Sequence, residues 1–361
     1  MLKTSNKSER LKAATTNKTS TEPLAVKMYY DKTMPAGQGV LSACREQIAL
    51  CKTIKDLKVI ENGFGKADIH HYHTINPPFF FSMLFRRFIC RKPTVAYVHF
   101  LPETTMDSVR LNKLYRWGFC WYMLRFYNAA KSLVVVNPDF IDKLVAFGIK
   151  REKITYIPNF VSKETFYPLP DSELVEAKAK YTETPRFTVV SAGQLQTRKG
   201  VFDFAKIAEQ LPDITFLWAG GFSFGSITQG YEEIQELLKN HPPNLKFVDI
   251  VPRAQMNTFL NAGDLFLLPS YAELFPMTIL EALNIHIPIV LRDIPEYEHI
   301  LPDYALFAQT NEEFVEHVKR LHDNAEHYKT HAARSEEGSK FYSKERIADL
   351  WNGFYQRVKK R

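Results

Sequence analysis

The sequence has few cysteines and no long apolar run. Its four cysteines, Cys44, Cys51, Cys90 and Cys120, form no CxxC pair and no zinc-ligand spacing with histidine. This pattern disfavours a disulfide-stabilised secreted scaffold and predicts free thiols in a reducing compartment. No stretch reaches the roughly 20 uninterrupted apolar residues of a membrane-spanning helix. Residues 1–26 lack the apolar core of a signal peptide and are predicted to be a disordered polar leader.

Acidic residues are missing from two long stretches. None occurs between Asp68 and Glu103, or between Asp107 and Asp139. Residues 1–160 carry 25 Lys and Arg against 12 Asp and Glu, a balance of +13, whereas the remainder carries 22 against 28, a balance of −6. A basic half joined to an acidic half indicates that one part of the chain faces an anionic surface. An anionic membrane and a nucleic acid are the two candidates.

The chain alternates short β-rich runs with helical patterns, which predicts parallel sheets covered by helices. The predicted strands are 26–30, 67–73, 94–100, 132–137 and 154–159, then 187–193, 214–221, 245–251, 265–270 and 287–293. A segment rich in proline and charge, 161–186, separates the two series. We therefore predict an α/β fold of two Rossmann-like, doubly wound domains with a cleft between them. Their predicted bounds are 27–164 and 165–342, with a helix at about 343–361 packing back on the first domain.

Two predicted strand ends of the second series carry candidate binding residues. Arg198 and Lys199 follow the strand that ends at Gly193 and precede a helix, where cations and free backbone N–H groups favour phosphate. Gly220 and Gly221 end the next strand and would let backbone approach a ligand closely. An Arg-Lys pair by itself is more often a solvated turn. Convergence at the carboxyl ends of strands in one sheet, where open α/β sheets bind ligands, favours a binding site.

Two glutamates mark a third strand end. The segment ELFPMTILE places Glu273 just after the apolar run LFLLPS and Glu281 inside the following helix. Buried carboxylates are costly without a polar partner, so each should meet local backbone or a ligand. A position about one turn into a helix suits Glu281 for sugar hydroxyls. Two glutamates at this spacing also occur by chance, so the surrounding sequence decides whether they indicate a binding site.

The segment AGDLFLLPSYAELFPMTILEALNIHIPIVLRD closely resembles the signature of family-4 glycosyltransferases of the GT-B fold, and the RKG loop and the double glycine match in the same order. The resemblance implies that Arg198 and Lys199 hold the donor pyrophosphate and that Glu281 binds the ribose. Donor sugar and phosphate would be held by Glu273 and by the backbone of Phe275, Pro276, Met277 and Thr278. Gln194 stands where many members have arginine, and Arg198 is expected to take over that role.

The resemblance extends into the first half. His99 ends the run TVAYVHF. A lone strand histidine is more often structural, but family members carry a histidine here beside the donor sugar, so the resemblance implies that His99 and Glu273 are the catalytic residues that orient the hexose. His73 aligns with a second family histidine, whereas His70 and His71 are expected to face elsewhere on the pleat.

The resemblance also bears on phosphate binding and on metals. Gly37 and Gly39 of MPAGQG, which lie between the first strand and a helix, are expected near the donor phosphate. No Asp-x-Asp pair occurs, so the metal-binding feature of the GT-A class is missing from the sequence. We expect a metal-independent enzyme without a cofactor, whose leaving diphosphate is neutralised by Arg198, Lys199 and helix N-termini.

The acid-free stretches mix aromatic residues with cations, in FFFSMLFRRFICRKP and RLNKLYRWGFCWYMLRFYNAAKS. This composition suits helices lying in an anionic bilayer interface. A buried helix with a few surface cations is the alternative. RNA binding uses the same residue types, but no RNA-binding motif occurs, so no nucleic-acid partner is expected. The candidate membrane residues are Arg86, Arg87, Arg91, Lys92, Arg110, Lys113, Arg116, Trp117, Trp121 and Arg125.

The phrases VHFLPET, VVVNPDFI, YIPNFVSKETFYPL and WAGGFSFGSITQGY most resemble bacterial glycosyl-diacylglycerol synthases. The resemblance implies a retaining transfer of glucose or galactose from a UDP-hexose to diacylglycerol or monoglucosyl-diacylglycerol. Such an enzyme would act peripherally at the cytoplasmic face of the cell membrane, in glycolipid and lipoteichoic-acid anchor synthesis. Which sugar is donated, and whether the acceptor already carries one, stay open. The alternatives are a soluble polysaccharide or protein glycosyltransferase and an inactive GT-B partner subunit.

Overall fold

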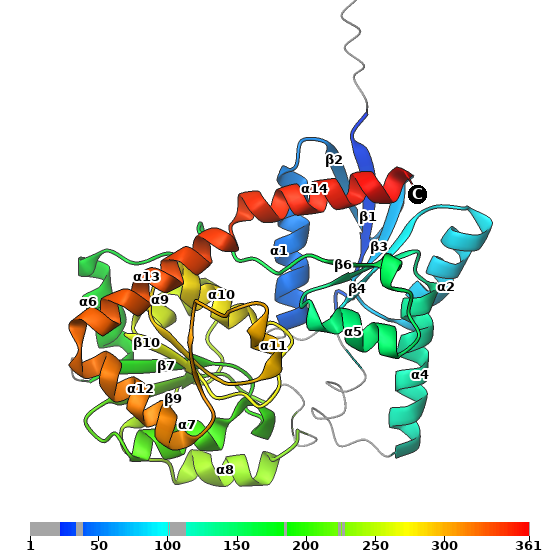
Figure 1. The fold of residues 1–361 in the computed structure, drawn as a ribbon. Helices are drawn as coiled ribbons and strands as arrows, with labels where there is room; N and C mark the ends of the chain where they lie inside the picture. Colours follow the sequence, from blue (N-terminus) through cyan, green and yellow to red (C-terminus); the bar gives the residue numbers. More distant parts are fainter. Residues whose placement is uncertain are drawn as a thin grey trace, which may run out of the picture.

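Two parallel six-stranded sheets, each flanked by helices, form the molecule (Figure 1). The computed structural model describes residues 22–33, 39–99, 101, 113–183, 186–222, 225 and 228–360. The first sheet has the strand order β2-β1-β3-β4-β5-β6 and the second β12-β11-β10-β7-β8-β9. The predicted α/β fold with two doubly wound sheets is confirmed.

The first half of the chain builds one sheet with its helices. Its elements are β1 (Leu24–Tyr29), α1 (Gly39–Thr53), β2 (Leu57–Glu61), β3 (Ile69–Tyr72), α2 (Pro77–Leu84), the π-helical turn η1 (Phe85–Ile89), β4 (Thr94–Val98), α4 (Lys113–Ala129), β5 (Ser132–Val135), α5 (Asp139–Ala146), η2 (Arg151–Lys153) and β6 (Ile154–Tyr156). Strands β3, β4 and β5 are buried along their whole length, because helices cover both faces of a parallel sheet.

The second half repeats this architecture. Its elements are α6 (Asp171–Tyr181), β7 (Thr188–Ala192), η3 (Thr197–Lys199), α7 (Val201–Glu209), β8 (Thr215–Ala219), α8 (Tyr231–Lys239), β9 (Leu245–Phe247), η5 (Arg253–Gln255), α9 (Met256–Asn261), β10 (Leu265–Leu268), α10 (Met277–Asn284), β11 (Ile289–Arg292), α11 (Pro295–Glu298), β12 (Leu306–Ala308), α12 (Asn311–Asp323), α13 (Ala325–Phe341) and α14 (Lys344–Lys360).

Each of the ten predicted strands overlaps an observed strand, and two further strands escaped prediction. These are β2 and β12, which lie at one edge of each sheet. An edge strand is paired on one side only. Strand β2, LKVIE, is mostly half-buried and carries polar residues, and β12 has three residues, so neither shows the apolar run that identifies a central strand.

The last helix returns to the first half of the molecule. In Figure 1, α14 runs from the second half across to α1, and it packs against α1 and β3. Its Tyr355 hydroxyl lies 2.7 Å from His71 Nδ1 and accepts a hydrogen bond from Gln47 Nε2 at 3.2 Å. Trp351 and Tyr355 are both buried in the core of the first half. The C-terminal segment therefore completes the core of the N-terminal sheet.

The four cysteines are free thiols, with Cys44 and Cys51 buried. Among the described residues, none of the helices combines the length and the hydrophobicity that crossing a bilayer requires.

Candidate functional site

Three loops of the second sheet lie at neighbouring strand ends. The η3 turn follows β7, Gly220 and Gly221 follow β8, and the loop 269–276 follows β10. Strands β10, β7 and β8 are adjacent in the sheet, so all three loops meet at one edge. The structure thus brings together the three segments that the sequence selected.

The centre of this edge is a buried charge cluster. Lys199 Nζ lies 2.5 Å from Glu273 Oε1, and Arg198 Nη1 lies 3.8 Å from Glu273 Oε2. Arg198 also donates a hydrogen bond to the carbonyl oxygen of Ala272. Burial opposes ionisation of Glu273, but the cations of Lys199 and Arg198 outweigh it and hold the pKa of this carboxyl below its ordinary value. Burial lowers the pKa of Lys199. The Glu273 carboxylate is therefore ionised and held between the two cations.

Glycines allow the strand ends to pack this closely. A Cβ at Gly200, where φ is 74°, would come within 2.2 Å of the Pro269 carbonyl oxygen. A Cβ at Gly220, where φ is 151°, would come within 1.8 Å of the Gly193 carbonyl oxygen. Gly221 faces the Ile250 side chain. These contacts lie within the protein itself, so Gly220 and Gly221 are required for packing whether or not they also face a ligand.

Glu281 has a partner that the sequence did not indicate. Its side chain is only 2% exposed, and Oε1 forms an ion pair with Arg253 Nη1. The second nitrogen of that guanidinium, Nη2, lies 3.1 Å from Glu46 Oε1 on α1, in the first half of the molecule. Burial raises the pKa of Glu281 although Arg253 opposes this rise. Oε2 of Glu281 is buried without a hydrogen-bond partner, so this oxygen is open to a donor.

The loop between the two glutamates leads into α10. This helix begins at Met277 after Pro276, and no side chain caps its N-terminus. Uncapped first-turn amides, here those of Met277 and Thr278, are suited to an anion such as phosphate. Phe275 precedes them and is buried.

Two asparagines that the sequence reading passed over hold this loop from the first half. Asn137 Nδ2 donates to the carbonyl oxygens of Leu274 at 3.2 Å and Glu296 at 2.7 Å. Asn159 Nδ2 donates to the Phe275 carbonyl oxygen at 3.4 Å. Each asparagine closely follows a strand of the first sheet, as the phrases VVVN and YIPN indicate. The two halves therefore meet at the candidate site through hydrogen bonds from asparagine side chains of the first half to backbone carbonyls of the second.

His99 directly follows β4 and is buried in a group of aromatic rings. Its ring centroid lies 4.2 Å from Tyr97 and 6.0 Å from His73. Burial lowers the pKa of His99 well below its ordinary value and that of His73 to about 3. Both imidazoles are thus neutral at physiological pH.

The expectation that His71 faces away from His73 is wrong. The two rings stack with centroids 4.4 Å apart, because alternate residues along an extended chain lie on one face. His70 does lie on the opposite face, where its Nδ1 is 2.9 Å from the Tyr29 hydroxyl. The stacked pair connects Tyr355 of α14 to the neighbourhood of His99.

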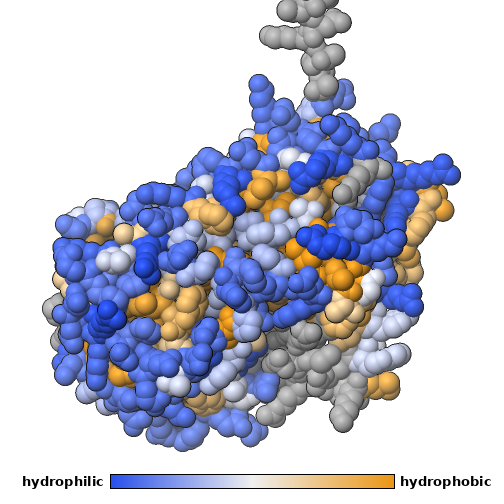
Figure 2. Space-filling view, in the orientation of Figure 1, coloured by the Kyte–Doolittle hydropathy of each residue, from blue (hydrophilic) through white to orange (hydrophobic). Residues whose placement is uncertain are grey.

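The described candidate membrane residues lie on η1, on the segment between η1 and β4, and on α4, and exposed apolar side chains of α2 adjoin them. Figure 2 shows apolar surface along the edge of the first half that these elements form. Large exposed side chains on them are Phe81, Phe85, Phe88, Ile89, Leu114, Tyr115, Trp117 and Trp121. Exposed cations beside them are Arg91 and Lys92, and the Arg125 guanidinium lies 5.2 Å from the Trp121 ring. We call this set the cationic–aromatic face.

Some of the residues predicted to contact membrane or phosphate have other roles or lie outside the described residues. Arg87 donates to the carbonyl oxygens of Asn128, Ala129 and Ala130, so it stabilises the C-terminal end of α4. Gly37 and Arg110 lie outside the described residues. Gly39 begins α1, and Lys113 and Arg116 belong to α4. In the described part of the chain, no three His, Cys, Asp or Glu side chains are grouped as metal ligands.

Two Rossmann-like parallel sheets flanked by helices are the architecture of the GT-B class of glycosyltransferases. The model "Glycosyltransferase Family 4" matches residues 38–165, and "Glycosyl transferases group 1" matches residues 175–340. Alpha-galactosylglucosyldiacylglycerol synthase of Streptococcus pneumoniae is 43% identical over 337 residues, which cover 92% of this chain and 90% of that protein. The chain therefore belongs to the family-4 glycosyltransferases.

Other similarities are more distant. Processive diacylglycerol alpha-glucosyltransferase of Acholeplasma laidlawii is 32% identical over 157 residues, 42% of this chain and 46% of that protein. The crystal structure of Anabaena Alr3699/HepE with UDP-glucose superposes with a TM-score of 0.75 at 15% identity and covers 92% of this chain and all of that one. Sucrose-phosphate synthase from Thermosynechococcus elongatus gives a TM-score of 0.73 at 14% identity, covering 93% and 99%. These structures support the GT-B fold.

Proposed function

We propose that this glycosyltransferase transfers a hexose from a UDP-hexose to diacylglycerol or a glycosyl-diacylglycerol at a membrane surface, with retention of configuration. The observation that carries the proposal is the buried cluster of Lys199, Arg198 and Glu273 at the strand ends that face the first sheet. The pneumococcal relative supports the acceptor class, because its name gives a galactosylglucosyldiacylglycerol as product.

The charge cluster accounts for the departure of the diphosphate. In the proposed reaction the donor diphosphate takes the place of the Glu273 carboxylate beside Lys199 and Arg198. Their charges stabilise the leaving group as the glycosidic bond breaks, and the first-turn amides of α10 add further donors. These groups supply the positive charge that a metal ion would otherwise bring, so we propose a metal-independent reaction.

The other predicted site residues take up the sugar and the nucleoside. Released from Lys199, Glu273 accepts hydrogen bonds from hexose hydroxyls, while the neutral imidazole of His99 orients the same sugar from the first half. Glu281 Oε2 accepts from the ribose. The site residues named above include no carboxylate assigned as a nucleophile, and we propose that the acceptor attacks on the face from which UDP leaves, with a donor phosphate oxygen helping to take the acceptor proton.

The cationic–aromatic face would hold the enzyme against the lipid. Exposed rings such as Phe85 and Trp117 suit the headgroup boundary, and Arg91 and Lys92 meet anionic lipid. We propose that the enzyme acts peripherally at the cytoplasmic side, where nucleotide sugars are available. A role in lipoteichoic-acid anchor synthesis would follow from such a product.

The proposal is tested with purified protein and liposomes that contain either diacylglycerol or monoglucosyl-diacylglycerol. Each is incubated with UDP-glucose and with UDP-galactose in the presence of a chelator, and the products and their anomeric configuration are identified by NMR. We expect an α-linked glycolipid from one donor. Transfer to soluble saccharides without binding to liposomes would instead identify a soluble glycosyltransferase, and lack of both transfer and donor hydrolysis would identify an inactive subunit.

A further inference from the structure

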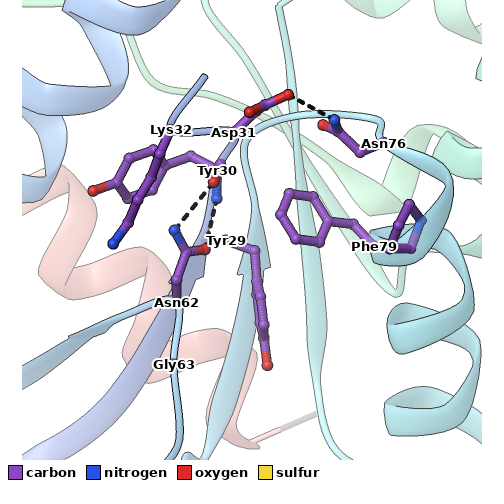
Figure 3. A pocket seen from close by; sticks show the side chains of 9 residues that line it. Tyr29, Tyr30, Asp31, Lys32, Asn62, Gly63, Asn76 and Phe79 are labelled. Atoms are coloured by element: carbon purple, nitrogen blue, oxygen red, sulfur yellow. Dashed lines mark hydrogen bonds between the residues drawn. The ribbon is translucent and has the colours of Figure 1, made fainter. Parts of the chain in front are cut away.

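A pocket of about 370 Å³ lies at the carboxyl ends of β1, β2 and β3 in the first sheet (Figure 3). Asp31 comes from the segment after β1, Asn62 from the segment after β2, and Asn76 from the segment between β3 and α2. Strand β3 is the neighbour of β4, whose end carries His99. The pocket therefore lies at the same edge of the sheet as His99, the proposed catalytic histidine. It is centred on β1, which is two strands away from β4 in the sheet.

The polar groups of the pocket are held in place by one another. Asp31 Oδ2 accepts a hydrogen bond from Asn76 Nδ2 at 2.8 Å, and Asn62 bonds to both backbone polar groups of Tyr30, at 3.1 and 3.2 Å. A hydrogen bond from the Thr33 hydroxyl lowers the pKa of Asp31, so this carboxylate is ionised at neutral pH. Each carboxylate oxygen can accept about two hydrogen bonds, which leaves Oδ2 of Asp31 with capacity for a ligand.

The pocket also has an aromatic wall. The rings of Tyr29 and Phe79 lie 5.7 Å apart, and both line the cavity. An apolar wall opposite a few fixed polar groups is typical of small-ligand sites. A hexose fits this combination, since its C–H face packs on aromatic rings while its hydroxyls donate to a carboxylate. Lys32 also lines the pocket, so the charges of Asp31 and Lys32 offset each other and an uncharged headgroup fits better than an ionised one.

A clamped loop forms one side of the pocket. Lys27 is 3% exposed, and its Nζ donates to the carbonyl oxygens of Gly63 at 3.0 Å and Gly65 at 2.9 Å. This clamp holds the NGFGK loop, residues 62–66, in a conformation where φ is 56° at Gly63 and 137° at Gly65. Phe64 at its tip is fully exposed. The clamp thus holds an exposed aromatic ring, which is the kind of side chain that enters the headgroup boundary of a bilayer.

The other side of the pocket continues into the cationic–aromatic face. Phe79 of α2 lines the cavity, and Phe81 and Phe85, further along α2 and η1, are exposed. Apolar side chains therefore project on both sides of a polar cavity. The charge of the neighbouring chain favours a bilayer over a protein partner, because no acidic residue occurs between Asp68 and Glu103.

We propose that this pocket holds the sugar headgroup of the glycolipid acceptor, while Phe64 and the cationic–aromatic face lie in the bilayer interface on either side of it. The acyl chains then stay in the membrane and the headgroup hydroxyls reach toward the donor. This assignment rests on the proposed function and adds to it the identity of the acceptor: a diacylglycerol that already carries a neutral hexose.

The test compares wild-type enzyme with Asp31→Asn, which keeps the shape of the side chain and removes its charge. Acceptors are dioctanoyl monoglucosyl-diacylglycerol, which is dispersed without liposomes, and dioctanoyl-glycerol. We expect the KM for the glycolipid to rise about tenfold or more, as loss of a charged hydrogen bond requires, with the KM for the UDP-hexose within twofold of wild type. Circular dichroism and UDP binding establish that the variant is folded.

A second variant separates the lipid contact from the sugar contact. Phe64→Ser should weaken binding to anionic liposomes and leave the KM for the dispersed glycolipid unchanged. If wild-type enzyme glycosylates the glycolipid and Asp31→Asn retains both KM values, the pocket assignment is wrong and the proposed function stands. If Phe64→Ser binds liposomes as tightly as wild type, the placement of the loop in the bilayer is wrong. If wild-type enzyme uses no diacylglycerol acceptor at all, the proposed function fails and the assignment fails with it.

Discussion

The two halves of the molecule carry their charges in opposite ways. In the second half the carboxylates of the site are buried and each is paired with a cation, Glu273 with Lys199 and Glu281 with Arg253. In the first half the cations of the cationic–aromatic face stand on helix surfaces among exposed rings, and the candidate catalytic residue is a neutral imidazole. Cations that are already held beside a buried carboxylate are suited to direct contact with a small anion. Exposed cations are suited instead to attraction by an extended anionic surface, and salt weakens that attraction.

The largest effect is expected at the matched pair. Lys199→Ala removes the buried cation closest to Glu273, and turnover should fall by about 10²–10³, as for other losses of a transition-state donor. Steady-state kinetics with the best donor and acceptor measure it. Because the variant leaves a buried carboxylate without its main partner, the double variant Lys199→Ala/Glu273→Gln is the control for folding. Near-normal turnover of Lys199→Ala would refute the role given to the cluster.

The neutral histidines of the first half should make stability depend on pH. The folded-state pKa of His73, about 3, lies below the ordinary value of 6.5, so the neutral ring stabilises the fold above pH 6.5 and this contribution is lost as pH falls toward 3. Between pH 6.5 and 5 the loss is about 2 kcal/mol for this residue.

Urea unfolding of wild-type enzyme and His73→Gln at both pH values measures this difference. The variant should lose about 2 kcal/mol less than wild type on acidification. An equal loss in the two proteins would show that His73 is not responsible. The Lys199–Glu273 pair offers an internal contrast, because the lowered pKa of Glu273 makes its contribution fade only as pH falls below the ordinary range of glutamate.

A smaller effect is expected where the two halves meet. Arg253→Ala leaves the buried carboxylate of Glu281 without its ion-pair partner, so Glu281 is no longer held for the ribose, and the KM for the UDP-hexose should rise about tenfold. Glu46→Gln is the matched control, since it removes the charge on α1 and leaves the Arg253–Glu281 pair intact. If both variants raise KM equally, the contact between the halves matters and the orientation of Glu281 does not.

The smallest effect is expected on the cationic–aromatic face. Lys92→Gln removes one exposed cation and should weaken binding to anionic liposomes by about 1 kcal/mol, or roughly fivefold. Lys239→Gln on α8 of the second half, which is also exposed, should bind like wild type. Sedimentation with liposomes at two salt concentrations measures both. Equal binding by the two variants would place the membrane-facing surface elsewhere.

Much of the fold could be predicted because central strands of parallel sheets are continuous apolar runs. The site loops could be predicted because parallel strands end at one edge, so Arg198, Lys199 and Glu273 had to be neighbours. The partner of Glu281 could not be predicted, since Arg253 lies 28 positions away in the chain and only the tertiary fold brings it to Glu281 and Glu46. The roles of Asn137 and Asn159 depend in the same way on how the two sheets face each other. His71 was misplaced although the alternation of a strand puts it on the side of His73.

The course of α14 has a consequence for how the protein is made. The strands of the first sheet are complete at Tyr156, but the helix that covers His71 begins at Lys344. During synthesis the strands of the first sheet leave the ribosome before α14, the helix that packs against β3. This helix is made only after the whole second half of the chain. Truncation of the C-terminal helix would therefore disturb the first sheet, because it removes the Tyr355 contact with His71.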